Sequence, residues 1–498
     1  MKKIIDFFNK YFIWFLFLIP VIYILTRTVI VDNDIWFILN SGRYVLNKGI
    51  PVIEPFTIHH NLSFVMQQWL SAVIYYIIWS KLTKYGLFIF INMIGIIFMF
   101  LYYKLLNIVS QNKKLNIIFT CIVFILIRNF ITTRPQIFTF IILILELICL
   151  EKYIKEQKSK YLYYLPILSF FEINLHSSMW FMQFAFLLPY LINGIFIHFM
   201  KKCDGKRYRI KPIIYTMIVM FIVGFINPYG YKAITYIFNS YGIYQINNYV
   251  GEMKRIDYDY KCFKIIFLMI CFLIIILNYK KNKIDLRYLL LLFGTLLLAY
   301  MNYKGIVYFY LIYFIVLINL LKGFKFNFKF RINQTLCKFL KSVFIGVKIA
   351  LPIMLIITLC YAICVSLINL KYDNYLKDTA DFIIKDAADI NKVKLYVGYN
   401  DGGYMEYRGI KSYIDPRAEV FLKKNNKKED IFIELYNLDN DDNFNFEEFL
   451  NKYDFNYLLV DNGEKFDKYL KNNENYELKF TQYDTDGKTI LCHLYKKV

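Results

Sequence analysis

Long apolar runs alternate with short polar segments through the first three quarters of the chain. The first run, 11–30, has about the 20 residues that a helix needs to cross a bilayer. It is too long for the apolar core of a signal peptide and lacks a small-residue cleavage site, so we predict a retained membrane helix. Further spans are predicted at 86–104, 116–130, 136–150, 161–173, 179–200, 212–226, 263–279, 286–302, 305–321 and 346–369, which gives about eleven in all.

The segment 32–85 separates the first two predicted spans and is polar enough to leave the bilayer. Within it the aromatic stretch 64–79 could itself span, but it carries Gln67, Gln68 and Ser71. We predict that this stretch is an amphipathic helix lying in the membrane interface. Counting it as a span would reverse the sidedness of every later loop.

The charge distribution decides between these two topologies. Residues 1–370 hold 40 Lys and Arg against 13 Asp and Glu, whereas residues 371–498 hold 20 against 25. The basic excess lies in short loops between apolar runs, which is the positive-inside pattern and argues against a nucleic-acid partner. We predict a multi-pass protein of the cell membrane with a cytoplasmic N-terminus and an extracytoplasmic C-terminal domain.

Residues 371–498 have the composition of a soluble domain and follow the transmembrane domain 1–370. Alternating helices and strands predict a small α/β fold. The spacing of a Gly-rich phosphate loop is absent, so a lid, scaffold or partner-binding role is expected in place of a nucleotide site. The predicted helices are 378–390, 428–437 and 445–452, the strands are 393–399, 410–414 and 457–460, a turn is at 400–403, and the hairpin is 477–483 with 489–495.

The predicted topology gathers unusual polar residues on the outer face. Each has a plain structural interpretation: Arg134-Pro135 can end a helix, and Asn227-Pro228-Tyr229-Gly230 has turn chemistry. Together they indicate a functional site, because charges at a membrane boundary are costly unless they are solvated, paired or used. The nine cysteines show neither a disulfide framework nor metal-ligand spacing. The candidate residues are Asp32, Asp34, Arg134, Glu172, Asn174, His176, Asn227, Tyr229, Glu252 and Lys304.

Short motifs along most of the chain resemble a bacterial family of multi-spanning proteins within the GT-C superfamily of integral-membrane glycosyltransferases. The motifs are Asp34-Ile35-Trp36-Phe37, Ser41-Gly42-Arg43-Tyr44-Val45-Leu46, Gly49-Ile50-Pro51, Glu54-Pro55-Phe56-Thr57, Gln68-Trp69-Leu70, Arg134-Pro135-Gln136, Asn174-Leu175-His176, Asn227-Pro228-Tyr229-Gly230, Asp401-Gly402-Gly403-Tyr404 and Ile414-Asp415-Pro416-Arg417.

The resemblance implies transfer of a sugar from a polyprenyl-phosphate carrier to a cell-envelope acceptor on the outer face. In that superfamily an acid of the first outer loop acts as base or helps to hold a metal, and Asp34, with Asp32 beside it, matches that position. A carboxylate can take the proton of an attacking hydroxyl, and cations stabilise the phosphate that leaves. Arg134, His176 and Lys304 are the candidate stabilisers, and a divalent Mg²⁺ or Mn²⁺ is the cofactor that the resemblance allows. The apolar helices and the segment 64–79 would hold the lipid tail.

Similar sequences tend to carry His or acidic residues where this chain has Ile38, Gln67, Gln68 and Ala72. This departure motivates the alternative of a non-catalytic membrane scaffold or handling protein for envelope polysaccharide. Transport is a weaker alternative, since intramembrane charges are few and no repeat of interrupted helices is evident.

Overall fold

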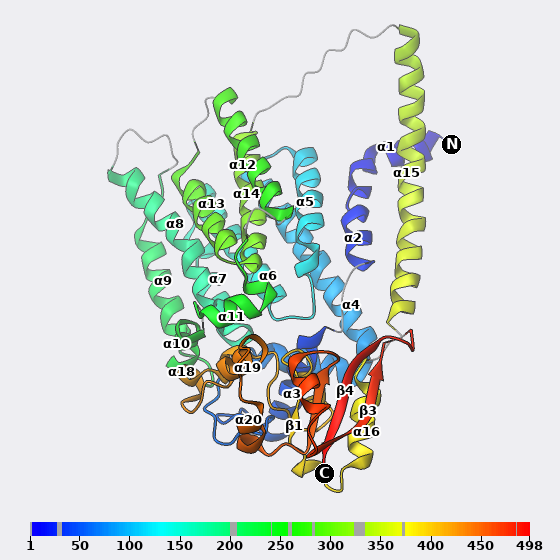
Figure 1. Ribbon diagram of the computed structural model, residues 1–498. Coiled ribbons are helices and arrows are strands. Elements are labelled where there is room, and N and C mark those ends of the chain that lie inside the picture. The colour runs from blue at the N-terminus through cyan, green and yellow to red at the C-terminus, as the bar shows by residue number, and fades with distance from the viewer. Residues whose placement is uncertain are drawn as a thin grey trace.

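Upright helices form the upper layer of the molecule, and the C-terminal residues form a mixed helical and sheet layer below them (Figure 1). The computed structural model describes residues 2–26, 32–199, 207–240, 242–256, 261–280, 284–322, 334–370, 374–484 and 486–498. Within these ranges five helices are long and apolar enough to cross a membrane, which confirms a membrane protein with several apolar helices. They are Trp69–Val109, Ser177–Phe199, Lys261–Asn278, Tyr303–Leu320 and Gly346–Asn369, and shorter apolar helices lie at Lys10–Leu25, Lys211–Val223 and Leu286–Met301.

The first apolar run does not form the single helix predicted at 11–30. Helix α1 (Lys2–Phe15) begins earlier than predicted, and a turn at residues 16–17 separates it from α2 (Leu18–Leu25). Residues 27–31 lie outside the described residues. The other upright helices of the upper layer are α5 (Lys113–Ile127), α6 (Gln136–Glu156), α7 (Tyr164–Leu175), α8 (Trp180–Phe199), α9 (Lys211–Val223), α12 (Lys261–Lys280), α13 (Leu286–Met301), α14 (Ile306–Leu320) and α15 (Gln334–Asn369). Two short helices, α10 (Tyr231–Ser240) and α11 (Tyr244–Tyr249), lie below them, next to the C-terminal layer (Figure 1).

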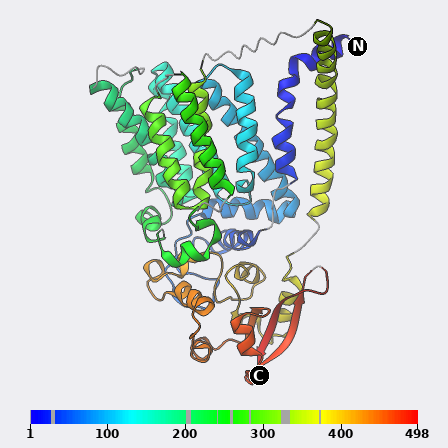
Figure 2. The ribbon, with the colours of Figure 1, turned by 45° about the horizontal axis from the view of Figure 1, so that its top comes forward.

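Two helices between these layers differ from the prediction. Helix α3 (Asn33–Lys48) was not expected. Helix α4 (Trp69–Val109) covers both predicted helices, 64–79 and 86–104, with a break between them, and differs from the prediction in that residues 64–68 are not helical. Thr83 has φ 53° and ψ −154° inside α4, so the helix turns sharply there. Figure 2 shows the first part of α4 lying across the lower ends of the upright helices. A Cβ at Gly42 would come within 2.2 Å of the Ala72 carbonyl oxygen, so glycine permits close packing of α3 on this part of α4.

The C-terminal layer contains one four-stranded sheet with the order β1-β2-β4-β3. Strand β1 (Leu395–Tyr396) runs parallel to β2 (Tyr457–Asp461), and the other pairs are antiparallel. The predicted hairpin is confirmed as β3 (Tyr476–Tyr483) and β4 (Ile490–Lys497). The helices are α16 (Lys377–Asp386), α17 (Gly402–Tyr407), α18 (Lys423–Asn426), α19 (Ile431–Asn440), α20 (Phe446–Tyr453) and α21 (Lys465–Leu470).

One predicted element of this layer is wrong, and one is confirmed in part. The strand expected at 410–414 makes only isolated bridges through Ser412, to Thr57 and to Leu395. The turn expected at 400–403 is present at 399–401 and leads into α17, which starts at Gly402 and packs on α3. Tertiary pairing with the segment before α4 therefore overrides the local apolar pattern at 410–414.

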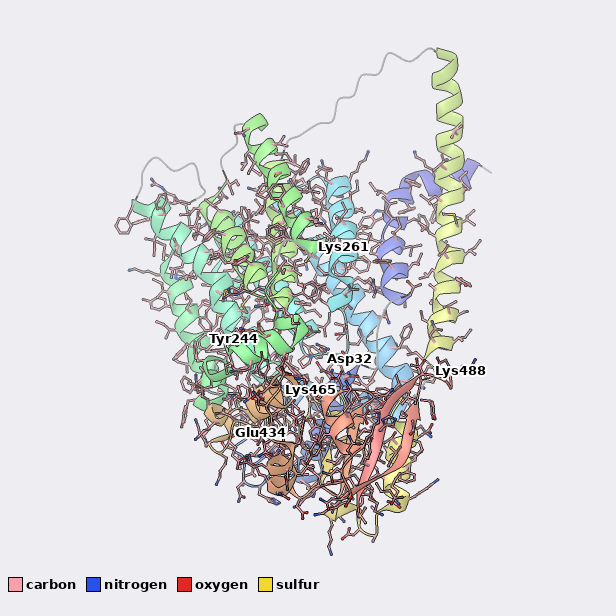
Figure 3. All side chains as sticks on the ribbon, in the orientation of Figure 1. Asp32, Tyr244, Lys261, Glu434, Lys465 and Lys488 are labelled. Carbon is pink, nitrogen blue, oxygen red and sulfur yellow. The ribbon has the colours of Figure 1, made fainter. Side chains whose placement is uncertain are left out.

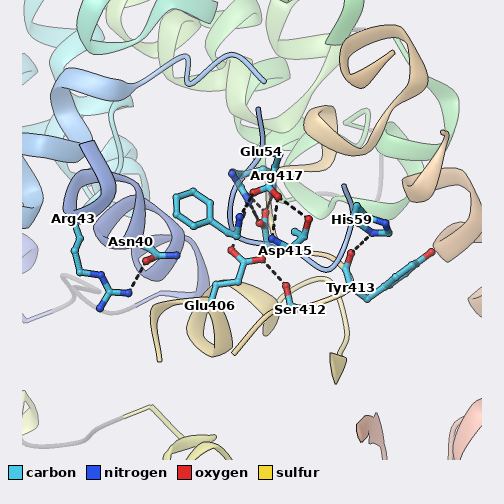
Figure 4. A network of polar contacts seen from close by, with 11 residues as sticks. Asn40, Arg43, Glu54, His59, Glu406, Ser412, Tyr413, Asp415 and Arg417 are labelled. Carbon is cyan, nitrogen blue, oxygen red and sulfur yellow. Dashed lines mark hydrogen bonds and ion pairs between the residues drawn. The ribbon is translucent and has the colours of Figure 1, made fainter. Parts of the chain in front are cut away.

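Residues 32–68, which we name the first outer loop after the predicted topology, are joined to the C-terminal layer by backbone hydrogen bonds and a buried ion network. Ile58 N donates to Ser412 O and Ser63 N to Asn426 O, both at 2.9 Å. Arg417 Nη2 donates to Glu54 Oε1 at 2.9 Å, and Nε and Nη2 of Arg417 both donate to the Asp415 carboxylate (Figure 4). We call Glu54, Glu406, Asp415 and Arg417 the joint.

Candidate functional site

Helix α3 begins with two acids that the local sequence fixes in place. Asp32 is the N-cap, and its side chain accepts a hydrogen bond of 3.1 Å from Ile35 N, which satisfies a backbone donor of the first turn. Asp34 lies in that first turn, where the positive end of the helix dipole favours an anion. Figure 3 shows Asp32 at the boundary between the upright helices and the C-terminal layer.

Arg134 brings three acids together from segments far apart in the chain. Its Nε lies 2.9 Å from Asp32 Oδ2, its Nη2 lies 3.1 Å from Asp34 Oδ2, and its Nη1 lies 2.7 Å from Glu252 Oε2. Lys304 Nζ lies 2.6 Å from the same Glu252 oxygen. We call Asp32, Asp34, Arg134, Glu252 and Lys304 the outer cluster.

The local environment separates Asp34 from Glu252 in proton affinity. Burial raises the pKa of Asp34 to about 6, although the charge of Arg134 opposes this rise. Burial also favours the protonated form of Glu252, but Lys304 and Arg134 outweigh that effect and lower its pKa. Asp34 thus changes protonation closer to neutral pH than Glu252 does, as a general base requires.

His176 and Glu172 belong to a second polar group, centred on Thr139 of α6. Thr139 Oγ1 donates to Glu172 Oε1 at 2.6 Å and lies 2.8 Å from His176 Nδ1. Burial, with the nearby charge of Lys304, lowers the pKa of His176 to about 3. The imidazole is therefore neutral, and Arg134 and Lys304 carry the positive charge on this side of the site.

Three of the candidate residues make hydrogen bonds to backbone atoms of the segments next to the outer cluster: Asn174, Asn227 and Tyr229. Asn174 accepts a hydrogen bond from Trp69 Nε1 at 3.1 Å and donates to Ile226 O at 3.0 Å. Asn227 Oδ1 accepts from Tyr229 N at 2.8 Å in the turn that the sequence predicted, which ends at Gly230 with φ 57°. The Tyr229 hydroxyl donates to Pro51 O at 2.8 Å and so attaches this turn to the first outer loop.

The donor set of the outer cluster does not fit a resident divalent metal ion. Mg²⁺ and Mn²⁺ prefer free carboxylate oxygens, but the guanidinium of Arg134 already lies about 3 Å from Asp32, Asp34 and Glu252. A divalent ion there would face a fixed positive charge at close range. Among the described residues no group of three or more His, Cys, Asp or Glu side chains is arranged to hold a metal ion.

No role was predicted from the sequence for the residues of the joint, although Glu54, Asp415 and Arg417 belong to two of the quoted motifs. Glu54 Oε2 accepts hydrogen bonds from Thr57 N and Thr57 Oγ1, at 2.9 and 2.7 Å. Glu406 accepts from Ser412 Oγ at 2.5 Å, as Figure 4 shows. The positions of Glu54 and Arg417 in quoted motifs could have marked both residues as candidates. Their pairing could be recognised only from the folded structure, because the two residues are far apart in the sequence.

No protein-family model and no curated protein sequence matches the chain. Its structure is similar to that of the Archaeoglobus fulgidus oligosaccharyltransferase. The apo crystal structure of that enzyme matches with a TM-score of 0.56 and 11% identity, over 91% of this chain and 70% of the other. The structure of the same enzyme tethered to an acceptor peptide containing the NVT sequon matches with a TM-score of 0.52 and 11% identity, over 92% and 70%. The chain therefore shares the fold of this oligosaccharyltransferase, as the expectation of a multi-pass glycosyltransferase-like fold requires.

Proposed function

We propose that this protein is a glycosyltransferase that moves a sugar from a polyprenyl-phosphate donor to a cell-envelope acceptor on the outer face of the membrane. The observation that carries the proposal is the outer cluster, in which a carboxyl group with a pKa of about 6 lies beside Arg134 and Lys304 at the edge of the helical layer. The similarity of the fold to an oligosaccharyltransferase supports the reaction class.

Asp34 acts as the base in this proposal. As the acceptor hydroxyl oxygen attacks the anomeric carbon of the donor sugar, its proton passes to the Asp34 carboxylate. The bond between the anomeric carbon and the phosphate oxygen breaks, and its electron pair stays with the polyprenyl phosphate. Because Arg134 holds Asp34 by a 3.1 Å ion pair, the carboxylate is oriented before the acceptor binds.

Lys304 and Arg134 stabilise the leaving phosphate. The ion pair with Glu252 occupies one of the three Nζ–H groups of Lys304. The remaining donors, together with the charge of Arg134, would neutralise the negative charge that develops on the phosphate. In this proposal the C-terminal residues 371–498 form an extracytoplasmic domain that covers the site, and the N-terminus is cytoplasmic.

The test is turnover of polyprenyl-phosphate sugars by the detergent-purified protein, measured as release of polyprenyl phosphate, for the wild type and Asp34→Asn. We expect the variant to fold normally and to lose about 10²–10⁴-fold in rate, the usual contribution of a general base. Asp378→Asn is the matched control, because Asp378 is an exposed acid in the first turn of α16 and its variant should keep full activity.

Equal rates for Asp34→Asn and the wild type would remove Asp34 from the role of base. Binding of polyprenyl-phosphate sugars without turnover, across a broad panel of donors and acceptors, would favour the non-catalytic scaffold that handles envelope polysaccharide.

A further inference from the structure

Three polar residues beside the outer cluster, Thr139, Glu172 and His176, form a chain of hydrogen bonds. Thr139 Oγ1 donates to Glu172 Oε1 at 2.6 Å and lies 2.8 Å from His176 Nδ1. A hydroxyl group has a single hydrogen to donate. Because Thr139 donates it to Glu172, the hydrogen of the second contact belongs to His176 Nδ1. The neutral imidazole therefore carries its proton on Nδ1, and Nε2 is left with a lone pair.

This chain runs from the interior of the helical layer to its accessible edge. Thr139 and Glu172 are fully buried, whereas His176 is partly exposed. Since Nδ1 faces the buried Thr139, the accessible part of the ring is the part that includes Nε2. Among the described residues Nε2 makes no hydrogen bond. The interior thus sets the tautomer, and the accessible side presents a hydrogen-bond acceptor.

The first part of α4 holds His176 next to the outer cluster. Ser71 Oγ donates to Leu175 O at 2.7 Å, and the Tyr75 hydroxyl donates to Arg134 O at 3.0 Å. Ser71 and Tyr75 are four residues apart on one helix, so they lie on the same face in adjacent turns. One face of α4 therefore fixes the residue before His176 and the central arginine of the outer cluster side by side.

The charges near His176 agree with an acceptor at Nε2. Burial, and after it the charge of Lys304, lowers the pKa of His176 and keeps the ring neutral. A lone pair is favoured near a cation, whereas an N–H group is disfavoured there. The reverse direction of the chain, in which a protonated Glu172 donates to Thr139, would place an N–H group on Nε2 on the side of Lys304. The electrostatics therefore favour the same tautomer as the hydrogen bonds.

We propose that His176 binds the substrate as a neutral hydrogen-bond acceptor through Nε2, and that Thr139 is the residue that positions it in this tautomer. The group it accepts from is a hydroxyl or amide N–H of a sugar. This role replaces the stabilisation of phosphate that the sequence predicted for His176. The inference rests on the proposed glycosyltransferase function for the identity of the ligand, but the tautomer is measurable without turnover.

The first experiment is ¹⁵N NMR of the detergent-purified full-length protein labelled only in histidine, because the shift of each ring nitrogen reports whether it carries a proton. The chain has 5 histidines, and the signals lost in His176→Gln identify His176. We expect a proton on Nδ1 alone near neutral pH. Thr139→Val, which removes the hydroxyl group at the same shape, should populate the other tautomer, and Thr139→Ser should keep the wild-type spectrum.

Thr295→Val is the matched control for this spectrum. The buried hydroxyl group of Thr295 donates to carbonyl groups of its own helix, so its removal should leave the His176 signals unchanged. A proton on Nε2 of His176 in the wild type would overturn the acceptor role. An unchanged tautomer in Thr139→Val would overturn the positioning role of Thr139. Thermal unfolding of each variant checks that the fold is retained.

The second experiment measures release of polyprenyl phosphate by variants of His176. His176→Phe should lower kcat/KM by about 10-fold, the value of one hydrogen bond between neutral groups. His176→Gln, whose amide oxygen reaches the position of Nε2, should recover most of this loss, whereas His176→Lys, which supplies a positive charge, should not. Adding Thr139→Val to His176→Phe should cause no further loss, because Thr139 acts through His176.

The two experiments separate failure of this inference from failure of the proposed function. If transfer proceeds and His176→Phe keeps the wild-type rate, or His176→Lys restores it, the acceptor role is wrong and the function stands. If no donor or acceptor turns over while the tautomer of His176 depends on Thr139, the hydrogen-bond chain stands and the glycosyltransferase proposal fails.

Discussion

The molecule holds two clusters in which one arginine meets three acids, and they differ in exposure. In the joint, Arg417 is 5% exposed and Glu54, Glu406 and Asp415 are fully buried. In the outer cluster, Arg134 is 21% exposed, Asp34 25% and Glu252 40%. The same residue types thus occupy a closed environment in one cluster and an accessible one in the other.

This difference separates a structural role from a chemical one. A buried arginine that is paired with buried acids stabilises one arrangement of the chain. Removing the arginine leaves the buried carboxylates without a counter-charge, which lowers the stability of the fold. A cluster that solvent and substrate can reach is able to exchange protons and partners. We therefore expect substitutions in the outer cluster to change activity and substitutions in the joint to change the free energy of unfolding.

The largest effect is expected at the joint. Arg417→Met leaves Glu54 and Asp415 buried without a counter-charge, and should lower the free energy of unfolding by about 3–5 kcal/mol. Thermal unfolding in detergent measures the change. Arg408→Met, which removes a partly exposed ion pair with Asp381, is the control and should cost less than about 1 kcal/mol. Similar losses for the two variants would contradict the structural role of the joint.

A smaller effect is expected when the arginine of the outer cluster is removed. Arg134→Gln removes the counter-charge of Asp32 and Asp34 and one of the two cations proposed to stabilise the leaving phosphate. The release of polyprenyl phosphate should therefore slow by about 10²–10³-fold, the usual effect of removing one such group. Arg255→Gln, at an exposed neighbouring arginine, is the control. An unchanged rate in Arg134→Gln would remove Arg134 from the role of stabiliser.

The smallest effect is the pH dependence of transfer. Because only the ionised carboxyl group of Asp34 accepts a proton, the rate should rise about tenfold per pH unit up to about pH 6 and stay level above it. Rates measured at saturating donor and acceptor test this. A rate that does not change between about pH 5 and 7 would contradict the assignment of Asp34 as base.

The sequence predicted the helical layer and the hairpin because both depend on long, regular patterns. It missed α3, although Asp32 at the N-cap and Gly49 at the C-terminal end, with φ 84°, are recognisable helix boundaries. The break at Thr83 lies in the polar stretch 80–85, between the helices predicted at 64–79 and 86–104, so its position was predicted. Its positive φ was not predicted, because this conformation is unusual for a β-branched residue.

The candidate site was predicted in part. The charge pattern placed Asp34, Arg134, Glu252 and Lys304 on one face, and the structure brings these four together. It could not show that His176 is neutral or that Tyr229 holds a turn, since both properties depend on neighbours distant in sequence. The joint was beyond sequence reasoning for the same reason.

The pairing of Glu54 with Arg417 has a consequence for how the protein is made. The two residues are 363 positions apart, so Glu54 leaves the ribosome long before its partner is synthesised. At about 5–20 residues per second, that interval is roughly 20–70 s. Until then the Glu54 carboxyl group lacks its counter-charge, so the loop that carries it cannot make its final contacts before residue 417 has been synthesised. Closure of the joint therefore waits for the C-terminal layer, and chains truncated before Arg417 cannot complete it.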